Sequence, residues 1–281
     1  MTISQNAEST TTAFTASSDV AVAAAAFPGS ARVELIMGMP VSVDIRTALP
    51  ARELNPLLDD AFAWLRWVDD TFSPAKEDSQ IGRLNRGRTL RQIPELVEVL
   101  HRCDELSEAT EGYFEARING VTDPSGYIKG WALERLSRAL SNAGAGDHRI
   151  SAGNDIRVRG SAAPGVRWRV GVRDPRDGVV RKVVCAHDLG IATSGGAPVV
   201  NPRTGEIQDG LRAVTVIGPD LGLADAYATA VFAMGPMPGR RFAADLARSG
   251  PYETMIILPD GQEVTTPGFA ERGGARSRLA G

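Results

Sequence analysis

Residues 213–234 read Ala-Val-Thr-Val-Ile-Gly-Pro-Asp-Leu-Gly-Leu-Ala-Asp-Ala-Tyr-Ala-Thr-Ala-Val-Phe-Ala-Met and predict a strand followed by a helix. The apolar run at 213–217 is typical of a strand, and the Gly-Pro-Asp after it is typical of a turn. Residues 224–234 are mostly Ala, Val, Phe and Met, and Gly235 closes them, as expected for a helix of the protein core. This stretch predicts a domain in which helices pack on a sheet.

Two polar residues stand out in that helix. Asp225 and Thr229 lie four residues apart, so an α-helix places both side chains on one face. Two oxygen donors one turn apart suit a hard divalent cation such as magnesium. The same spacing fits an amphipathic core helix whose polar residues decorate one face, so other segments must decide between the two interpretations.

Helices and strands are mixed along the rest of the chain without a regular strand-helix-strand alternation. Residues 32–45 alternate apolar and polar side chains around Met37-Gly38-Met39-Pro40, which predicts two strands that meet at a bend. Further strands are predicted at 149–158, 166–172, 182–186 and 253–258, and helices at 57–68, 94–109 and 240–249, with another ending near residue 143. This mixture predicts an α+β fold with a mostly antiparallel sheet and packed helices.

The two ends of the chain differ in composition from the middle. Residues 1–30 are rich in Ser, Thr and Ala and predict a disordered tail, and residues 265–281 predict a flexible C-terminal tail. The predicted folded domain is 31–264. No Lys or Arg precedes the weakly apolar run at 20–27, so we expect no signal peptide. No apolar run is long enough to span a membrane, and we expect a cytoplasmic protein.

Composition excludes several classes of function. The formal net charge is -3 without a basic stripe, so nucleic acid is not an expected partner. Cys103 and Cys185 stand far apart, which indicates neither a disulfide framework nor a zinc site. Thr193 and Ser194 have no base beside them in a chain with three histidines, so a serine hydrolase is disfavoured.

Five segments, in this order along the chain, resemble motifs of one enzyme family. They are Met37-Gly38-Met39-Pro40, Phe72-Ser73 with Asp78-Ser79 and Arg83-Leu84-Asn85, the loop and helix start at 123–132, Ala192-Thr193-Ser194-Gly195 with Asn201-Pro202-Arg203-Thr204-Gly205, and Ala224-Asp225-Ala226 with Thr229. Their order and spacing resemble the FAD:protein FMN transferase family, also called the ApbE family and formerly thiamine biosynthesis lipoproteins.

The resemblance implies a single ApbE-like domain with a cofactor cleft between two lobes. It implies magnesium-dependent transfer of the FMN part of FAD to a threonine hydroxyl of an acceptor flavoprotein, with release of AMP. Cleaving a pyrophosphate demands charge neutralisation and in-line positioning, so a metal clamp with cationic and backbone donors is the expected equipment. On this pattern, Asp225, Thr229 and the main-chain carbonyl of Gly126 ligate the magnesium ion.

The resemblance also implies a set of residues that border FAD. The lysine of the loop at 123–132 would lie near the FAD phosphates or near an exchangeable acid. Met37 resembles the flavin-contacting methionine of the family, and Tyr113-Phe114-Glu115 resembles a family segment that borders the cofactor. The residues so implied are Met37, Tyr113, Phe114, Glu115, Asp123, Lys129 and Val200. Two alternatives stay open: Lys129 as a solvated surface lysine, and Met37 as a core thioether that fills a gap.

This sequence departs from the family at the position of the proton-transfer groups. Pro198 stands where the family has His, and Asn201 stands where it has Asp, so the loop has no general base and no catalytic residue is assigned. Ala75 stands where the family often has Tyr, which removes a ring that would stack on flavin. A magnesium-dependent FAD:protein FMN transferase, slowed by this loop, is the first hypothesis. A FAD pyrophosphatase and a non-catalytic FAD-binding protein are the alternatives.

Overall fold

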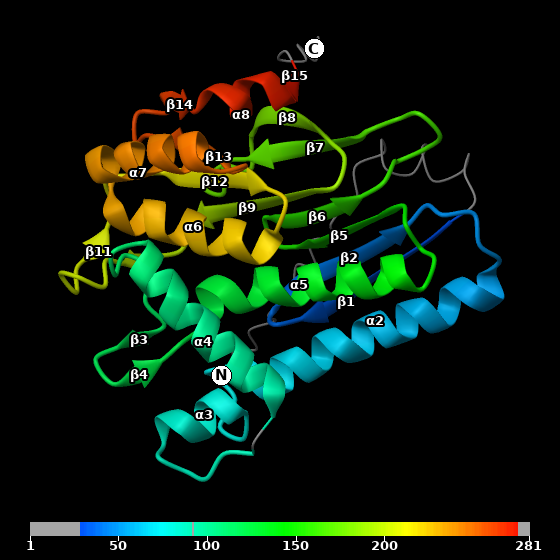
Figure 1. Cartoon of the computed structure of the whole chain (residues 1–281), viewed down its shortest axis with the longest axis horizontal. Coiled ribbons are helices and arrows are strands. Elements are labelled where there is room, and N and C mark those ends of the chain that lie inside the picture. The colour runs from blue at the N-terminus through cyan, green and yellow to red at the C-terminus, as the bar shows by residue number, and fades with distance from the viewer. Residues whose placement is uncertain (1–28, 92, 275–281) are drawn as a thin grey trace, which may run out of the picture.

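The largest element of the structure is an eight-stranded antiparallel sheet with strand order β1-β2-β5-β6-β9-β12-β13-β14 (Figure 1). The computed structural model describes residues 29–91 and 93–274. The strands are β1 (Ser30–Ile36), β2 (Met39–Ile45), β5 (His148–Ala152), β6 (Asp155–Arg159), β9 (Leu189–Gly195), β12 (Ala213–Gly218), β13 (Glu253–Ile257) and β14 (Glu263–Thr265). Every pair of neighbours is antiparallel, which confirms the α+β fold with a mostly antiparallel sheet.

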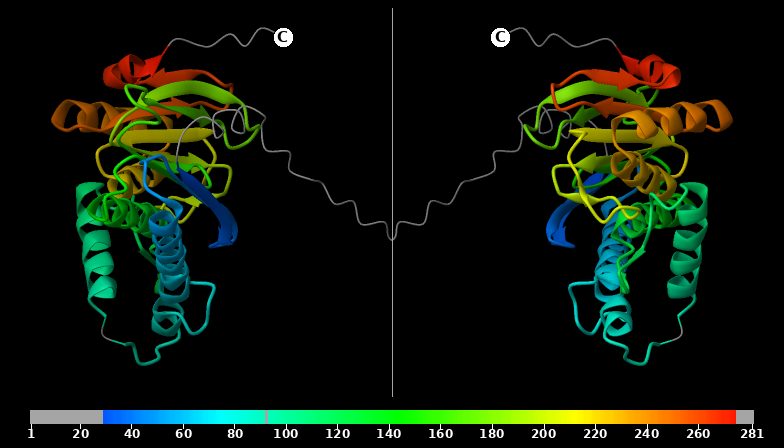
Figure 2. Two further views of the ribbon diagram at one scale, coloured as in Figure 1. Left: turned by 90° about the vertical axis from the view of Figure 1, so that its right-hand side faces the viewer. Right: turned by 90° about the vertical axis from the view of Figure 1, so that its left-hand side faces the viewer.

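Helices cover one face of this sheet. Those that pack on its strands are α2 (Ala51–Phe72), α5 (Ser125–Asn142), α6 (Leu221–Met234) and α7 (Pro236–Ser249), while α3 (Gln80–Asn85) and α4 (Pro94–Ala109) lie outside this layer. In the side views, α6 and α7 lie on one side of the sheet (Figure 2). Nearly all residues of α6 are buried, because this helix packs against the sheet, α5 and α7 together. Its Ala-rich composition follows from that position.

A second, smaller sheet closes a second core on the other face. It consists of β7 (Trp168–Arg173), β8 (Val180–Ala186) and β15 (Gly273–Gly274), with helix α8 (Pro267–Arg272) beside it. Strand β12 serves both cores: Val214 and Val216 join the core under the helices, and Ala213 and Ile217 join the second core. A strand buried on both faces carries a continuous apolar run, as residues 213–217 do.

The prediction of a flexible tail from residue 265 is wrong for residues 265–274. Helix α8 begins at Pro267, and the Phe269 side chain is completely buried in the second core. One large aromatic ring supplies enough buried area to hold a short helix in place. The predicted N-terminal tail at 1–30 ends too late, because Ser30 already pairs with Ile45 as the first residue of β1. Residues 1–28 of that tail and residues 275–281 lie outside the described residues.

Several element boundaries also differ from the sequence prediction. The strand predicted at 149–158 is the hairpin β5–β6, turned at Gly153, whose φ is 58°. The helix predicted at 57–68 extends over the whole of α2. Strand β9 was not predicted, because its Gly, Ala, Thr and Ser residues have weak strand character and are buried through tertiary packing. Within the described part of the chain, no helix is long and apolar enough to cross a membrane.

Candidate functional site

Two glycines let the start of α5 approach α6 closely. A Cβ atom on Gly130 would lie 2.6 Å from the Leu221 carbonyl oxygen and 2.9 Å from Cβ of Asp225. A Cβ atom on Gly126 would lie 3.3 Å from Oγ1 of Thr229. The side chains of Asp225 and Thr229 therefore face the first turns of α5, and the structure brings together the three predicted magnesium ligands.

Asp225 is a nearly buried acid, with 4% of its surface exposed. Its Oδ2 accepts a hydrogen bond of 3.1 Å from the Gly130 amide. Burial, reinforced by the charge of Asp155, raises the pKa of Asp225 above its ordinary value. In an α-helix the amide of residue 130 ordinarily donates to the carbonyl of residue 126. Here the Gly130 amide also donates to Asp225, so its hydrogen bond to the Gly126 carbonyl oxygen is a shared one.

Lys129 lies between two carboxylates. Its Nζ is 2.6 Å from Oδ2 of Asp155 and 3.9 Å from Oδ2 of Asp225. Burial lowers the pKa of Lys129, but the two carboxylates outweigh burial and hold the pKa above its ordinary value. The side chain is 25% exposed. The interpretation of Lys129 as a solvated surface lysine is therefore wrong, and the expected nearby acid is present.

The Thr229 hydroxyl has a neighbour that the sequence did not assign to the site. Oγ of Ser194 lies 3.2 Å from Oγ1 of Thr229. The preceding Thr193 is tied to Asp155 through its amide, at 3.0 Å, and to Thr215 through its hydroxyl, at 2.9 Å. The segment matching the family's A-T-S-G motif thus lies directly beside the helix that carries Asp225.

The donor set of this junction fits a hard cation. It offers one carboxylate, one hydroxyl and one main-chain carbonyl, all oxygen donors, and magnesium typically takes few protein ligands and keeps water or phosphate in its other positions. Residues 29–91 and 93–274 contain no group of three or more His, Cys, Asp or Glu side chains placed to hold a metal ion.

A cavity of about 460 Å³ lies beside the junction. Its lining includes Met37, Phe72, Ala75, Ile128 and Lys129. Met37 and Gly38 both have positive φ, 54° and 73°, and form the two-residue turn between β1 and β2. Met37 packs partly on the core and also lines the cavity, so its two interpretations are compatible. Whether the cofactor cleft lies between two lobes stays a prediction.

The other residues implied to border FAD are spread around the start of α5. Phe114 is buried and meets Gly126, where an added Cβ would lie 3.2 Å from its ring. Oδ1 of Asp123 accepts from the amide of Ser125, the first residue of α5, at 2.9 Å. Both oxygens of Glu115 are hydrogen bonded, one to the Ser107 hydroxyl and one to the Arg117 amide. The carboxylates of Asp123 and Glu115 therefore accept hydrogen bonds from neighbouring residues of the chain.

The loop that departs from the family forms a small hairpin of β10 (Val199–Val200) and β11 (Ile207–Gln208). Pro198 is exposed, Val200 is 38% exposed, and Oδ1 of Asn201 accepts from the Arg203 amide at 2.9 Å. The Arg203 guanidinium lies over the Tyr113 ring, 4.9 Å from its centroid. The hairpin is therefore held next to the segment that contains Phe114.

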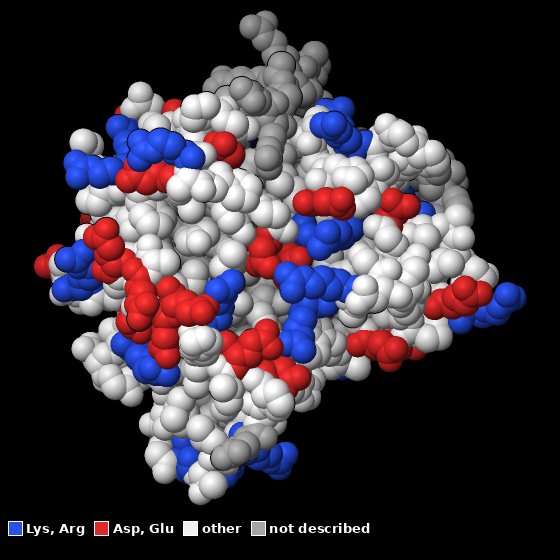
Figure 3. Space-filling model, in the orientation of Figure 1, with Lys and Arg blue, Asp and Glu red and all other residues white. Residues whose placement is uncertain are grey.

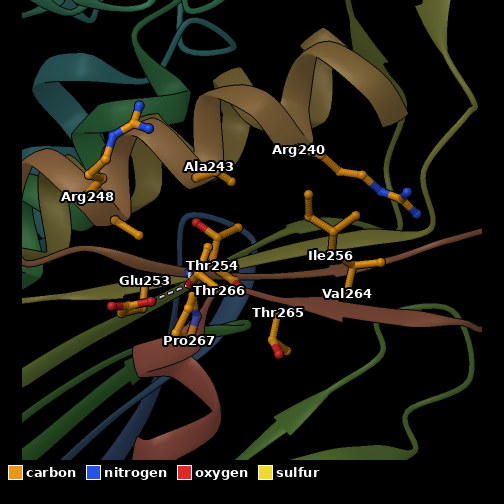
Figure 4. Close-up of a pocket in the computed structure, with 12 residues that line it drawn as sticks. Arg240, Ala243, Arg248, Glu253, Thr254, Ile256, Val264, Thr265, Thr266 and Pro267 are labelled. Atoms are coloured by element: carbon orange, nitrogen blue, oxygen red, sulfur yellow. Dashed lines mark hydrogen bonds between the residues drawn. The ribbon is translucent and has the colours of Figure 1, made fainter.

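The molecule also has a groove away from this junction. This groove of about 420 Å³ lies between α7 and the strands β13 and β14, with Ile256 and Val264 on the strands and Arg240, Ala243 and Arg248 along its helical wall (Figure 4). It contains none of the predicted site residues. On the face shown in Figure 3, acidic and basic side chains are interspersed. The junction of α5, α6 and β9 is therefore the candidate functional site.

The sequence profile of the ApbE family matches residues 37–123 and 119–252. The chain belongs to the ApbE family. The FAD:protein FMN transferase of Escherichia coli K12 is 32% identical over 183 residues, which cover 59% of this chain and 51% of that protein. The chain thus spans about half the length of this ApbE relative. The FAD:protein FMN transferase of Treponema pallidum is 22% identical, over 86% of this chain and 88% of that protein.

Solved structures of other ApbE proteins share the fold. The Thermotoga maritima ApbE protein superposes with a TM-score of 0.78 at 21% identity, over 88% of this chain and 100% of that one. The flavin transferase ApbE of Vibrio cholerae superposes with a TM-score of 0.72 at 21% identity, over 87% of this chain. These similarities confirm the ApbE-like fold, and relatives at about 30% identity are named for flavin transfer from FAD.

Proposed function

We propose that this ApbE-family protein transfers the FMN part of FAD to a threonine hydroxyl of an acceptor flavoprotein and releases AMP, with magnesium bound at the junction of α5 and α6. One observation carries the proposal: Asp225, Thr229 and Gly126 meet beside Lys129 and a 460 Å³ cavity. Oxygen donors for a cation, an ammonium group and a space for a ring system are what pyrophosphate cleavage of FAD requires.

In this proposal, some residues neutralise the charge of the phosphates and others position the reacting groups. Asp225, Thr229 and the Gly126 carbonyl would hold magnesium, which when bound neutralises phosphate charge. The Lys129 ammonium binds phosphate oxygens on the cavity side. The threonine oxygen of the acceptor attacks the FMN phosphorus, the bond from that phosphorus to the AMP oxygen breaks, and the hydroxyl proton passes to solvent. Positioning carries most of such a reaction, so it proceeds without a covalent enzyme intermediate.

The β10–β11 hairpin limits the rate of flavin transfer in this proposal. Pro198 and Asn201 offer no group that accepts a proton from the attacking hydroxyl, and loss of such a group typically slows a reaction by about 10²- to 10⁴-fold. We therefore propose a slow transferase. The alternative is a FAD pyrophosphatase, in which water takes the place of the acceptor hydroxyl at the same site.

The test is incubation of the full chain with FAD, magnesium and a panel of candidate flavoproteins. Transfer predicts covalent flavin fluorescence in an acceptor after denaturing electrophoresis, together with one AMP for each flavin attached. Magnesium chelation should abolish both signals. AMP and FMN formed at the same rate with and without acceptor would replace the transferase with the pyrophosphatase. FAD binding with neither product would leave a non-catalytic FAD-binding protein.

A further inference from the structure

Asp155 is a neighbour of Lys129 and Asp225, but its side chain is completely buried behind them. Its side chain has no exposed surface, so it cannot touch FAD or an acceptor. Both of its oxygens are engaged by the protein: Oδ1 accepts from the Thr193 amide at 3.0 Å, and Oδ2 lies 2.6 Å from Nζ of Lys129. Asp155 therefore acts on the site through its neighbours: its charge lies near Asp225, and its carboxylate pairs with the Lys129 ammonium.

The bond to the Thr193 amide fixes the position of the Asp155 carboxylate. Asp155 is the first residue of β6, which pairs with β9, and Thr193 lies within β9. Thr193 is held in turn by the hydroxyl pair with Thr215 of β12. Three neighbouring strands thus hold this acid in place, and a side chain with a flexible stem, Lys129, is tied to it.

Lys129 has a competing partner. Its ammonium is 3.9 Å from Oδ2 of Asp225, the one carboxylate among the proposed magnesium ligands. A shift of about 1 Å along the flexible lysine stem would bring the two into direct contact. An ammonium in that position would compete with a divalent cation for the same carboxylate, because both neutralise its charge at the same place.

We propose that Asp155 is a positioning residue that holds the Lys129 ammonium off Asp225, so that the Asp225 carboxylate stays free for a divalent cation and the ammonium stays on the cavity side. This inference rests on the proposed function for the role of Asp225. It assigns Asp155 an effect on ion affinity that is distinct from substrate contact, and it makes that effect dependent on the charge of Lys129.

The test measures binding of Mn²⁺, alone and with ADP, to the full chain by electron paramagnetic resonance. Asp155→Asn keeps an acceptor for the Thr193 amide but loses the charge that holds Lys129. We expect its Mn²⁺ affinity to fall by about 10-fold or more, the size of effect typical of groups that orient metal ligands. The double variant Asp155→Asn/Lys129→Gln should recover the affinity of Lys129→Gln alone, because no ammonium is left to occupy Asp225.

Controls separate this effect from a general loss of structure. Asp44→Asn removes an acid of another strand of the same sheet, one that pairs with Arg46 and not with Lys129, and should leave Mn²⁺ affinity unchanged. If Asp155→Asn does not fold, Asp155→Ser, which also keeps an acceptor for the amide, is measured in its place. Unchanged affinity in the folded Asp155 variant, or a loss that persists in the double variant, would overturn the inference alone. No binding by the wild-type protein would overturn the proposed metal site and this inference with it.

Discussion

Asp225 is a carboxylate held almost entirely inside the protein, between the Gly130 amide and the Lys129 ammonium. We expect Asp225→Ala to lower magnesium-dependent AMP release from FAD by about 100-fold or more, because the only carboxylate of the proposed donor set is lost. The folded state should persist, since an acid with a raised pKa does not stabilise the empty site. Chromatographic measurement of AMP and a thermal melt check both statements.

Asp245→Asn is the matched control, because Asp245 is an exposed acid on α7 that pairs with Arg248 away from the junction. Its AMP release should equal that of the wild-type protein, as expected for a surface ion pair. Turnover of Asp225→Ala at the rate of this control would refute the metal assignment.

The hairpin residues Pro198 and Asn201 offer a test by gain of activity. Introducing Pro198→His together with Asn201→Asp should raise the rate of flavin attachment, by up to about 100-fold, because the loop regains a proton acceptor. An aspartate at 201 can still accept from the Arg203 amide, so the turn should survive. Single-turnover flavin fluorescence in the acceptor measures the rate. An unchanged rate would mean that this protein activates the hydroxyl by other means.

Among the elements, the contact of α5 with α6 decides the geometry of the site. Gly130→Ala places a methyl group 2.6 Å from the Leu221 carbonyl and 2.9 Å from Asp225, so the helices must separate. We expect a loss of about 1–3 kcal/mol in the free energy of unfolding and weaker Mn²⁺ binding, because Asp225 moves with α6. Urea denaturation and ion titration measure these two effects.

Gly146→Ala provides the control within the same protein. An added Cβ at Gly146 meets no atom within 4 Å, so its effect on the free energy of unfolding should stay within about 0.5 kcal/mol. Equal destabilisation by the two substitutions would argue against close helix packing as the cause.

The elements also differ in how far local sequence predicts them. Helix α4 spans the predicted residues 94–109, because Pro94 marks its start and its apolar residues recur at helical spacing. The bend at Met37-Gly38 was predicted because its turn chemistry is local. Strand β9 and helix α8 were missed, because small residues in β9 and one phenylalanine in α8 acquire their structure only by being buried against distant strands.

On the scale of the whole molecule, a buried histidine couples global stability to pH. His148 has no exposed surface, and its ring bonds the Ser137 hydroxyl at 2.8 Å and the Ala145 carbonyl at 2.7 Å. Burial lowers its pKa to about 4. Below its unfolded pKa of about 6.5, only the unfolded chain takes up the proton, so stability falls between about pH 6.5 and pH 4.

From pH 7 to pH 5 this one group should remove about 2 kcal/mol from the free energy of unfolding, a figure that follows from the linkage relation. His148→Gln keeps a polar side chain for Ser137 but does not titrate. The difference between the pH profiles of the two proteins isolates the histidine from the carboxylates that both share. Parallel profiles in urea denaturation at pH 5 and pH 7 would contradict the assignment.

Residues close together in the chain determined much of this protein by themselves. Local geometry determines the strand and helix at 213–234 and the spacing of Asp225 and Thr229. Together with the order of five motifs along the chain, these features sufficed to predict the fold class and the family. The tertiary structure alone decided that Asp155 holds Lys129, that Ser194 meets Thr229 and that Phe269 fills a second core. The register of distant strands and the close approach of two helices at glycine set these contacts, and no local pattern encodes either.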